Sequence, residues 1–219
     1  PRHAEPGEPG EEFELRLELK LIADCGLVGL PNAGKSTLLK ALTRANPKIA
    51  DYPFTTLSPQ IGVHDLGGER RVVIADIPGL IEGASQGAGL GHSFLRHLER
   101  TRVLVHVLDI APPDRSSPAD NYRTIREELR GYTSELAEKD EIIALNKLDQ
   151  LPEPELREEV IADLRQELQL GRDVEIFAIS GATGEGLKPL MERVWERVSR
   201  RRPAEAKKED GWGARPRPE

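Results

Sequence analysis

A glycine-rich stretch near the start of the chain carries the residue types that hold a phosphate chain. It reads Gly29-Leu30-Pro31-Asn32-Ala33-Gly34-Lys35-Ser36 and matches the pattern G-x-x-x-x-G-K-[ST]. The two glycines let the backbone curl tightly enough for several N–H groups to converge on phosphate oxygens. Lys35 adds a positive charge, and the Ser36 hydroxyl can bind Mg²⁺ at the positive end of a helix expected from Thr37 onward. Residues 29–37 therefore predict a nucleotide-binding loop.

Two further stretches offer ligands for a metal ion and for a terminal phosphate. Asp76-Ile77-Pro78-Gly79 closes a strand-like run, where the carboxylate can hold a water on Mg²⁺ and the Gly79 N–H can meet the phosphate. Phe54-Thr55-Thr56-Leu57-Ser58 contains the only adjacent hydroxyl pair between the glycine loop and Asp76. We favour Thr56 as the Mg²⁺ ligand, with Thr55 as the alternative. The non-functional interpretation is that the two threonines only cap a turn. The predicted metal ligands are Ser36, Thr56 and Asp76.

A third motif has the chemistry to select the base. In Asn146-Lys147-Leu148-Asp149, the Asp149 carboxylate can accept hydrogen bonds from the ring N1–H and the exocyclic amino group of guanine. Adenine presents an acceptor at the same place, and a site left with an unpaired buried polar group can reject the wrong base by roughly 10⁴-fold. Ser180-Gly181-Ala182 would brace this loop and offer a backbone N–H to the guanine O6. These residues predict guanine; plain surface turns after strands are the alternative.

The elements that must position these motifs alternate between strand and helix along the chain. Apolar runs predict strands at 21–28, 61–66, 71–76, 103–108, 142–145 and 174–179. Helical spacing predicts helices at 37–44, 92–101, 119–136, 154–170 and 187–198. Gly67-Gly68 predicts a hairpin between two of the strands. The pattern predicts an α/β protein with the three-layer P-loop NTPase fold, a mostly parallel central sheet with helices on both faces and the ligand at the carboxyl ends of the strands.

Composition limits the class of protein. The chain has 219 residues, 37% of them hydrophobic, and a formal charge of −7, which argues against a surface that coats nucleic acid. A single cysteine, Cys25, excludes an internal disulfide and fits a reducing cytoplasm, and no apolar run is long enough to cross a membrane. We expect a monomer with a linker and a strand from a preceding domain at 1–20, a nucleotide-binding domain at 21–200 and a disordered linker at 201–219. The start at Pro1 suggests an excerpt of a longer protein.

The motifs together resemble a known family. GLPNAGKS, DYPFTTLSPQIG, DIPGLIEGASQGAGLGHSFLRHLERTRVLVHVLD, NKLD and SGAT are similar to the GTPase domain of the Obg family, over about residues 15–200. The resemblance implies a Mg²⁺-dependent molecular switch that hydrolyses GTP to GDP and phosphate. It further implies a role in assembly of the large ribosomal subunit and in the stress response, with binding of guanosine tetraphosphate. Gly181 departs from the alanine usual in the family, but the backbone donor survives the change.

The catalytic step depends on residues from several of these motifs. The candidate catalytic residues are Lys35, Thr56, Gly79 and Asn32. Leu80 stands where many GTPases carry a water-orienting glutamine, so we expect slow intrinsic turnover that a partner accelerates. Asn32 either binds K⁺, as in GTPases such as MnmE whose phosphate loop this one resembles, or simply forms the turn. The alternative function is a non-catalytic guanine-nucleotide and alarmone sensor; Asp149 argues against an ATP-using relative.

Overall fold

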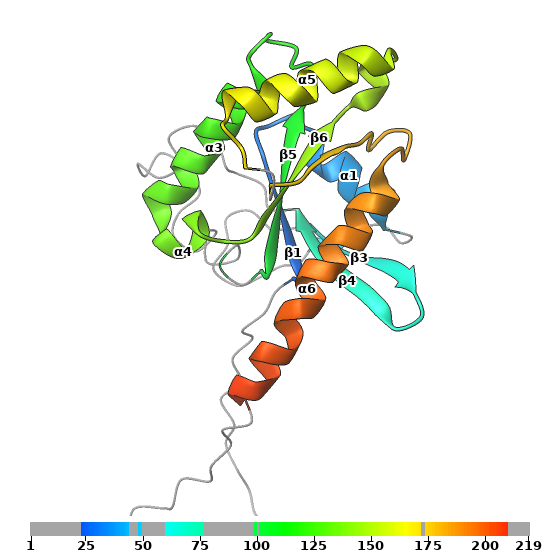
Figure 1. Ribbon diagram of the computed structural model, residues 1–219. Coiled ribbons are helices and arrows are strands. Elements are labelled where there is room, and N and C mark those ends of the chain that lie inside the picture. Colours follow the sequence, from blue (N-terminus) through cyan, green and yellow to red (C-terminus); the bar gives the residue numbers. More distant parts are fainter. Residues whose placement is uncertain are drawn as a thin grey trace, which may run out of the picture.

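Seven strands form one sheet in the computed structural model, which describes residues 23–43, 48–49, 60–76, 99, 101–171 and 174–209. Their order across the sheet is β2-β3-β4-β1-β5-β6-β7 (Figure 1). Their bounds are β1 Cys25–Val28, β2 Lys48–Ile49, β3 Gln60–Gly67, β4 Arg70–Asp76, β5 Val103–Asp109, β6 Glu141–Asn146 and β7 Ile176–Ala178. The run from β4 to β7 is parallel, whereas β3 is antiparallel to both of its neighbours. The predicted mostly parallel sheet is confirmed.

The hairpin between β3 and β4 lies where the sequence predicts it. Gly67 and Gly68 have φ values of 93° and 65°, in the left-handed region that glycine adopts without strain. The hairpin brings β4 back beside β1, with Leu27 opposite Asp76. The end of β4 therefore lies next to the strand that leads into the glycine loop.

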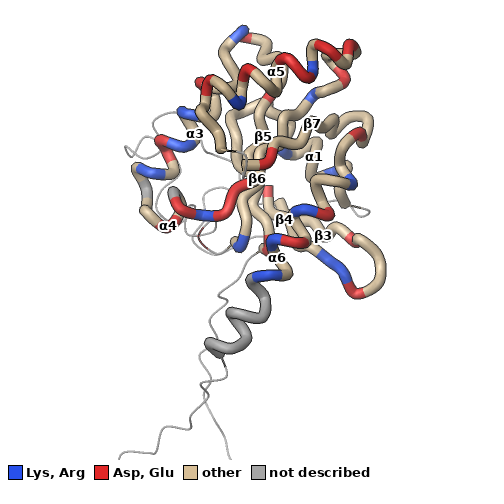
Figure 2. Tube along the Cα trace, in the orientation of Figure 1, with Lys and Arg blue, Asp and Glu red and all other residues tan. Residues whose placement is uncertain are grey.

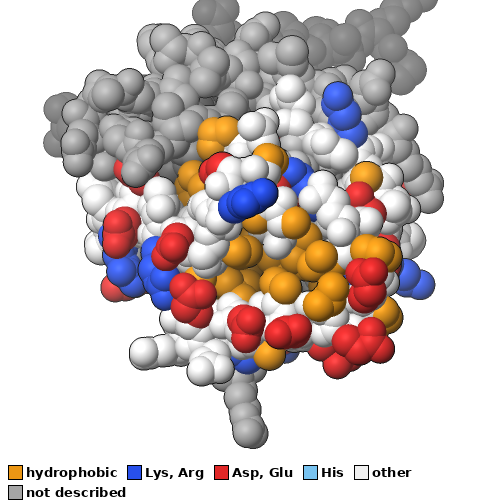
Figure 3. Space-filling view, turned by 90° about the horizontal axis from the view of Figure 1, so that it is seen from above, with side chains coloured by type: hydrophobic (Ala, Val, Ile, Leu, Met, Phe, Trp, Pro, Cys, Tyr) orange, Lys and Arg blue, Asp and Glu red, His pale blue; other side chains and the backbone are white. Residues whose placement is uncertain are grey.

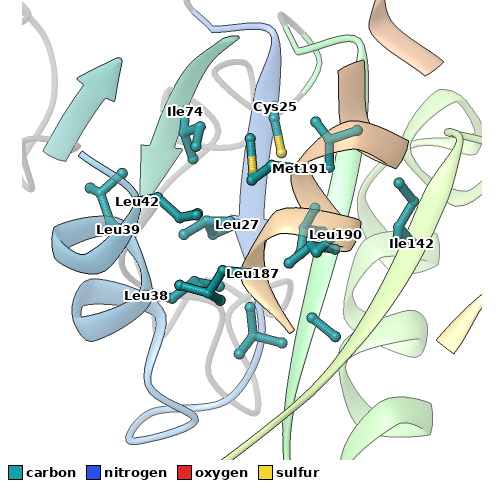
Figure 4. Packing of buried hydrophobic residues seen from close by; sticks show 14 of the residues in the cluster. Cys25, Leu27, Leu38, Leu39, Leu42, Ile74, Ile142, Leu187, Leu190 and Met191 are labelled. Carbon is teal, nitrogen blue, oxygen red and sulfur yellow. The ribbon is translucent and has the colours of Figure 1, made fainter. Parts of the chain in front are cut away.

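Helices cover both faces of the sheet, which makes three layers. Their bounds are α1 Lys35–Leu42, α3 Pro118–Tyr132, α4 Ser134–Ala137, α5 Pro154–Glu167 and α6 Leu187–Glu209, and a short 3₁₀ helix, η2, spans Leu148–Gln150. On one face, α1 and α6 pack against β1, β4, β5 and β6; Figure 4 shows their side chains pointing toward one another. On the other face, α3, α4 and α5 pack against the sheet. Successive residues of β5 alternate between the two cores, because side chains alternate along a strand.

Two of the described helices differ markedly from their predicted bounds, and the helix predicted over 92–101 lies almost entirely outside the described residues. The helix predicted over 119–136 is divided at Thr133, which has an extended backbone (φ −147°, ψ 151°) and accepts a hydrogen bond from the Leu136 N–H to begin α4. The last helix continues beyond Val198 to Glu209, because the residues after Pro203 are mostly strong helix formers. This backbone enters the segment 201–219, predicted to be a disordered linker, as far as Glu209. Residues 1–22 and 210–219 lie outside the described residues, so the domain boundaries stay a prediction.

Among the residues that the structure describes, none of the helices has the length and apolar character needed to cross a bilayer.

Candidate functional site

The glycine loop joins the end of β1 to the start of α1, and its glycines are required by close contacts. Gly29 and Gly34 have φ values of 149° and 96°. A Cβ atom on Gly29 would lie 2.3 Å from the carbonyl oxygen of Val107 in β5, and one on Gly34 would lie 2.3 Å from Nδ2 of Asn146. Neither position has room for a side chain. The loop is therefore held tightly against the ends of its neighbouring strands, with its curl at the carboxyl end of the sheet.

Lys35 closes this loop from the first turn of α1. Its Nζ donates hydrogen bonds to the carbonyl oxygens of Gly29 at 2.9 Å and of Leu30 at 3.0 Å. Burial lowers the pKa of the ammonium group, while the charge of the nearby Asp76 carboxylate acts in the opposite direction. The positive charge thus lies over the curl of the loop, where the sequence predicts the phosphate chain.

Ser36 and Asp76 meet beside the loop and form the described part of the predicted metal site. The Ser36 hydroxyl donates to Asp76 Oδ2 at 2.6 Å, which connects the start of α1 to the end of β4. Among the described residues, Asp76 Oδ1 is buried without a hydrogen-bond partner. A buried carboxylate oxygen left unpaired is costly, and hydroxyl and carboxylate oxygens are the ligands that Mg²⁺ prefers. The donor set therefore fits the predicted magnesium ion.

Asn146 connects the glycine loop to the two loops predicted to read the base. Its side chain is 2% exposed at the end of β6. Nδ2 donates to the carbonyl oxygen of Ala33 at 2.9 Å, and Oδ1 accepts from the backbone N–H of Gly181 at 2.9 Å. The Gly181 N–H, predicted as the donor to guanine O6, is thus engaged by Asn146 here. One buried carboxamide holds three separate segments of the chain at fixed distances from one another.

Asp149 is fixed by a neighbouring hydroxyl group. Ser180 Oγ donates to Asp149 Oδ1 at 2.5 Å and also accepts from the Thr183 N–H at 3.1 Å. Asp149 itself is exposed to solvent in η2. Its carboxylate is therefore oriented by Ser180 and still accessible to a base.

Sequence reasoning missed Asp109 at the end of β5. Asp109 Oδ2 forms an ion pair with Lys147 Nζ at 2.5 Å, although the sequence indicated only that a strand ends there. One signal could have identified it. Asp109 is a carboxylate at the end of the apolar strand β5, and the next strand in the sequence, β6, ends at Asn146.

The surface around the site has no broad basic patch in the part of the chain that the structure describes. Acidic and basic residues are interspersed along the helices (Figure 2). Figure 3 looks onto the end of the molecule toward which β5 points in Figure 1, and it shows hydrophobic side chains in a central hollow with acidic side chains along its border. Binding of an anionic phosphate chain is therefore expected to depend on the loop N–H groups, Lys35 and a metal ion.

Part of the predicted site lies outside the described residues. This applies to Phe54, Thr55, Thr56, Leu57, Ser58, Ile77, Pro78, Gly79 and Leu80, whose roles stay predictions. The structure places the remaining candidates together at the carboxyl end of the sheet: residues 29–37, Asp76, Asn146, Lys147, Asp149 and 180–182. Asn32 has a left-handed backbone with φ 63°, which suits a turn and leaves the potassium prediction untested.

The fold and this site define a P-loop nucleotide-binding domain, and comparisons with known proteins identify its family. The family model for the 50S ribosome-binding GTPase matches residues 24–147. GTPase Obg of Herpetosiphon aurantiacus is 57% identical over 195 residues, which cover 89% of this chain and 44% of that protein. GTPase Obg of Aquifex aeolicus is 52% identical over 206 residues, which cover 94% and 59%. The chain belongs to the 50S ribosome-binding GTPases and, within them, to the Obg family, as its motifs predict.

A solved structure agrees with this fold. A variant of Aquifex aeolicus Era, bound to GDP and AlF₄⁻, superimposes with a TM-score of 0.57 at 23% sequence identity, and the match covers 80% of this chain and 56% of that one. This confirms the predicted three-layer α/β fold. The chain spans about half the length of the curated relatives that it matches.

Proposed function

We propose that this chain binds GTP and GDP and hydrolyses GTP to GDP and phosphate, with Mg²⁺ as its cofactor. The observation that carries the proposal is the Asn146 bridge, because it fixes the distance between a phosphate-binding loop and a carboxylate suited to guanine. A nucleotide is a ligand with a phosphate chain at one end and a base at the other. The site has matching groups at both ends and a rigid connection between them.

The described residues divide the work of binding and positioning. Lys35 and the N–H groups of the glycine loop would hold the phosphates, and Asp149 would accept from the guanine edge. Ser36 and Asp76 would hold Mg²⁺, which neutralises charge on the phosphate oxygens when it is bound. Thr56 and Gly79 are proposed to meet the metal ion and the terminal phosphate.

The wider role follows from the family. We infer that the bound nucleotide switches the protein between two states, and that one state acts on the large ribosomal subunit during its assembly and in the stress response. Guanosine tetraphosphate is proposed as a further ligand, since it shares the guanine and diphosphate groups. A ribosomal partner would place the protein in the cytoplasm, where we propose that it works as a monomer. Slow turnover, accelerated by K⁺ at Asn32 or by the partner, would explain how Leu80 replaces a glutamine.

Phosphate release from GTP tests the proposal directly. The reaction is measured with Mg²⁺ or EDTA, in KCl or NaCl at matched ionic strength, and with or without large ribosomal subunits. We expect release that requires Mg²⁺ and that falls strongly in Asp76→Ala. The matched control is Asp163→Ala, which removes an exposed carboxylate from α5. If GDP binds but no phosphate is released under any condition, the non-catalytic sensor is the better description; equal rates in KCl and NaCl exclude the potassium effect.

A further inference from the structure

The ion pair between Asp109 and Lys147 lies between the two ends of the site. Asp109 lines a cavity of about 170 Å³ together with residues 30–33 of the glycine loop. Lys147 belongs to the loop that contains Asp149, and its ammonium group reaches back to Asp109 Oδ2 at 2.5 Å. The pair therefore connects the base-reading loop to the end of β5, and Asp109 also borders the phosphate loop across that cavity.

Asp109 is itself held rigidly. Its second carboxylate oxygen, Oδ1, accepts from the Ala111 N–H at 3.1 Å. In the sheet register Asp109 lies opposite Asn146, and the Ile110 N–H donates to the Asn146 carbonyl oxygen at 3.0 Å. The side chain of Asp109 is 7% exposed and that of Lys147 is 23% exposed. Both carboxylate oxygens have partners, so the group is a fixed point for the lysine.

The backbone of Lys147 is constrained as well as its side chain. Its backbone is left-handed, with φ 69° and ψ 36°, a conformation that residues with a Cβ adopt at a cost. A lysine side chain has several rotatable bonds and loses considerable freedom when it is held in one conformation. The ion pair fixes that conformation before any ligand arrives, which lowers the entropic cost of binding. A Lys147 side chain held in this way would present its apolar stem to a base bound at Asp149.

We propose that Asp109 is a positioning residue for the nucleotide, acting through Lys147, whose fixed stem forms one wall of the base pocket. This inference rests on the proposed function. A partly buried ion pair contributes little net stability, because desolvation offsets the attraction. The main effect of the pair is therefore expected on the retention of a bound nucleotide, with a smaller effect on folding.

A double-mutant cycle on nucleotide release tests this inference. Dissociation of a fluorescent GDP analogue is measured by stopped flow for the unsubstituted chain, Asp109→Asn, Lys147→Met and the double variant. Asp109→Asn preserves the shape of the residue and removes its charge. We expect dissociation to become faster by about tenfold, because Lys147 is no longer held in one conformation for the bound nucleotide. Asp163→Asn is the control, because it removes an exposed carboxylate from α5 that does not line this cavity; its rate should not change.

Comparing the effect of Asp109→Asn with and without Lys147→Met distinguishes a positioning role of Asp109 from a general structural role. In Lys147→Met, Asp109→Asn should add less than about twofold, because the residue through which it acts no longer carries a charge. An equal effect of Asp109→Asn in both backgrounds would overturn the proposal, as would an unchanged rate in Asp109→Asn itself. Thermal unfolding without nucleotide shows whether each variant is folded. If the unsubstituted chain binds no GDP, the proposed function fails and this inference with it; if it binds GDP normally, only the inference is at stake.

Discussion

Asn146→Ala is the substitution whose cost follows most directly from the structure. It leaves the Ala33 carbonyl and the Gly181 N–H without their carboxamide partners at a position that is 2% exposed. Each buried polar group left unsatisfied costs about 1–3 kcal/mol, so the free energy of unfolding should fall by about 2–6 kcal/mol. For a chain of this size, about 1 kcal/mol corresponds to a shift of about 2–4 °C, so the melting temperature should fall by about 4–24 °C.

The assay separates this structural connection from recognition of the base. Urea unfolding without nucleotide, followed by circular dichroism, gives the stability, and calorimetric titration with GDP gives the affinity; both should fall in Asn146→Ala. Asp149→Asn is the matched comparison, because its side chain is exposed. Its stability should stay within about 0.5 kcal/mol of the unsubstituted chain while its preference for GDP over ADP is lost. An Asn146→Ala variant within about 0.5 kcal/mol of the unsubstituted chain would refute the bridge.

Three further predictions concern small residues in the glycine loop, in the loop after β7 and at the start of β1. Gly29→Ala should lower GDP affinity by about 1–3 kcal/mol in calorimetry, because its Cβ would lie 2.3 Å from the Val107 carbonyl oxygen; unchanged affinity would contradict the close packing. Gly181→Ala should keep GDP binding and cost about 1 kcal/mol in urea unfolding, because its Cβ would lie 3.3 Å from Leu38 backbone atoms. Burial, followed by the charge of Asp24, raises the pKa of the Cys25 thiol from 9.0 to about 12. The thiol ionises more readily in the unfolded chain, so its contribution to stability is complete below pH 9 and is lost as the pH rises toward 12; Cys25→Ala in parallel urea titrations should lack this loss.

Short sequence patterns predicted the strands, helices and turns that depend mainly on residues close together in the sequence. Apolar runs next to the motifs identified the strands, and Gly67-Gly68 identified the hairpin because two consecutive glycines favour a left-handed turn. The same reasoning failed at Thr133, where apolar residues continue at helical spacing on both sides of the break. The spacing of apolar residues indicates which face of a helix is buried. It does not indicate where a threonine side chain ends one helix and caps the next.

The sequence by itself determined which residue types stand at each end of the site: a glycine loop at 29–36, proposed to hold phosphates, and a carboxylate at Asp149, proposed to read guanine. The tertiary structure alone decided that Asn146 reaches Ala33, although 113 positions separate them in the chain. It also paired Asp109 with Lys147. The physical reason is the order of the sheet, in which β5 lies between β1 and β6. That order depends on which faces the whole chain can bury together, and no short stretch of sequence carries this information.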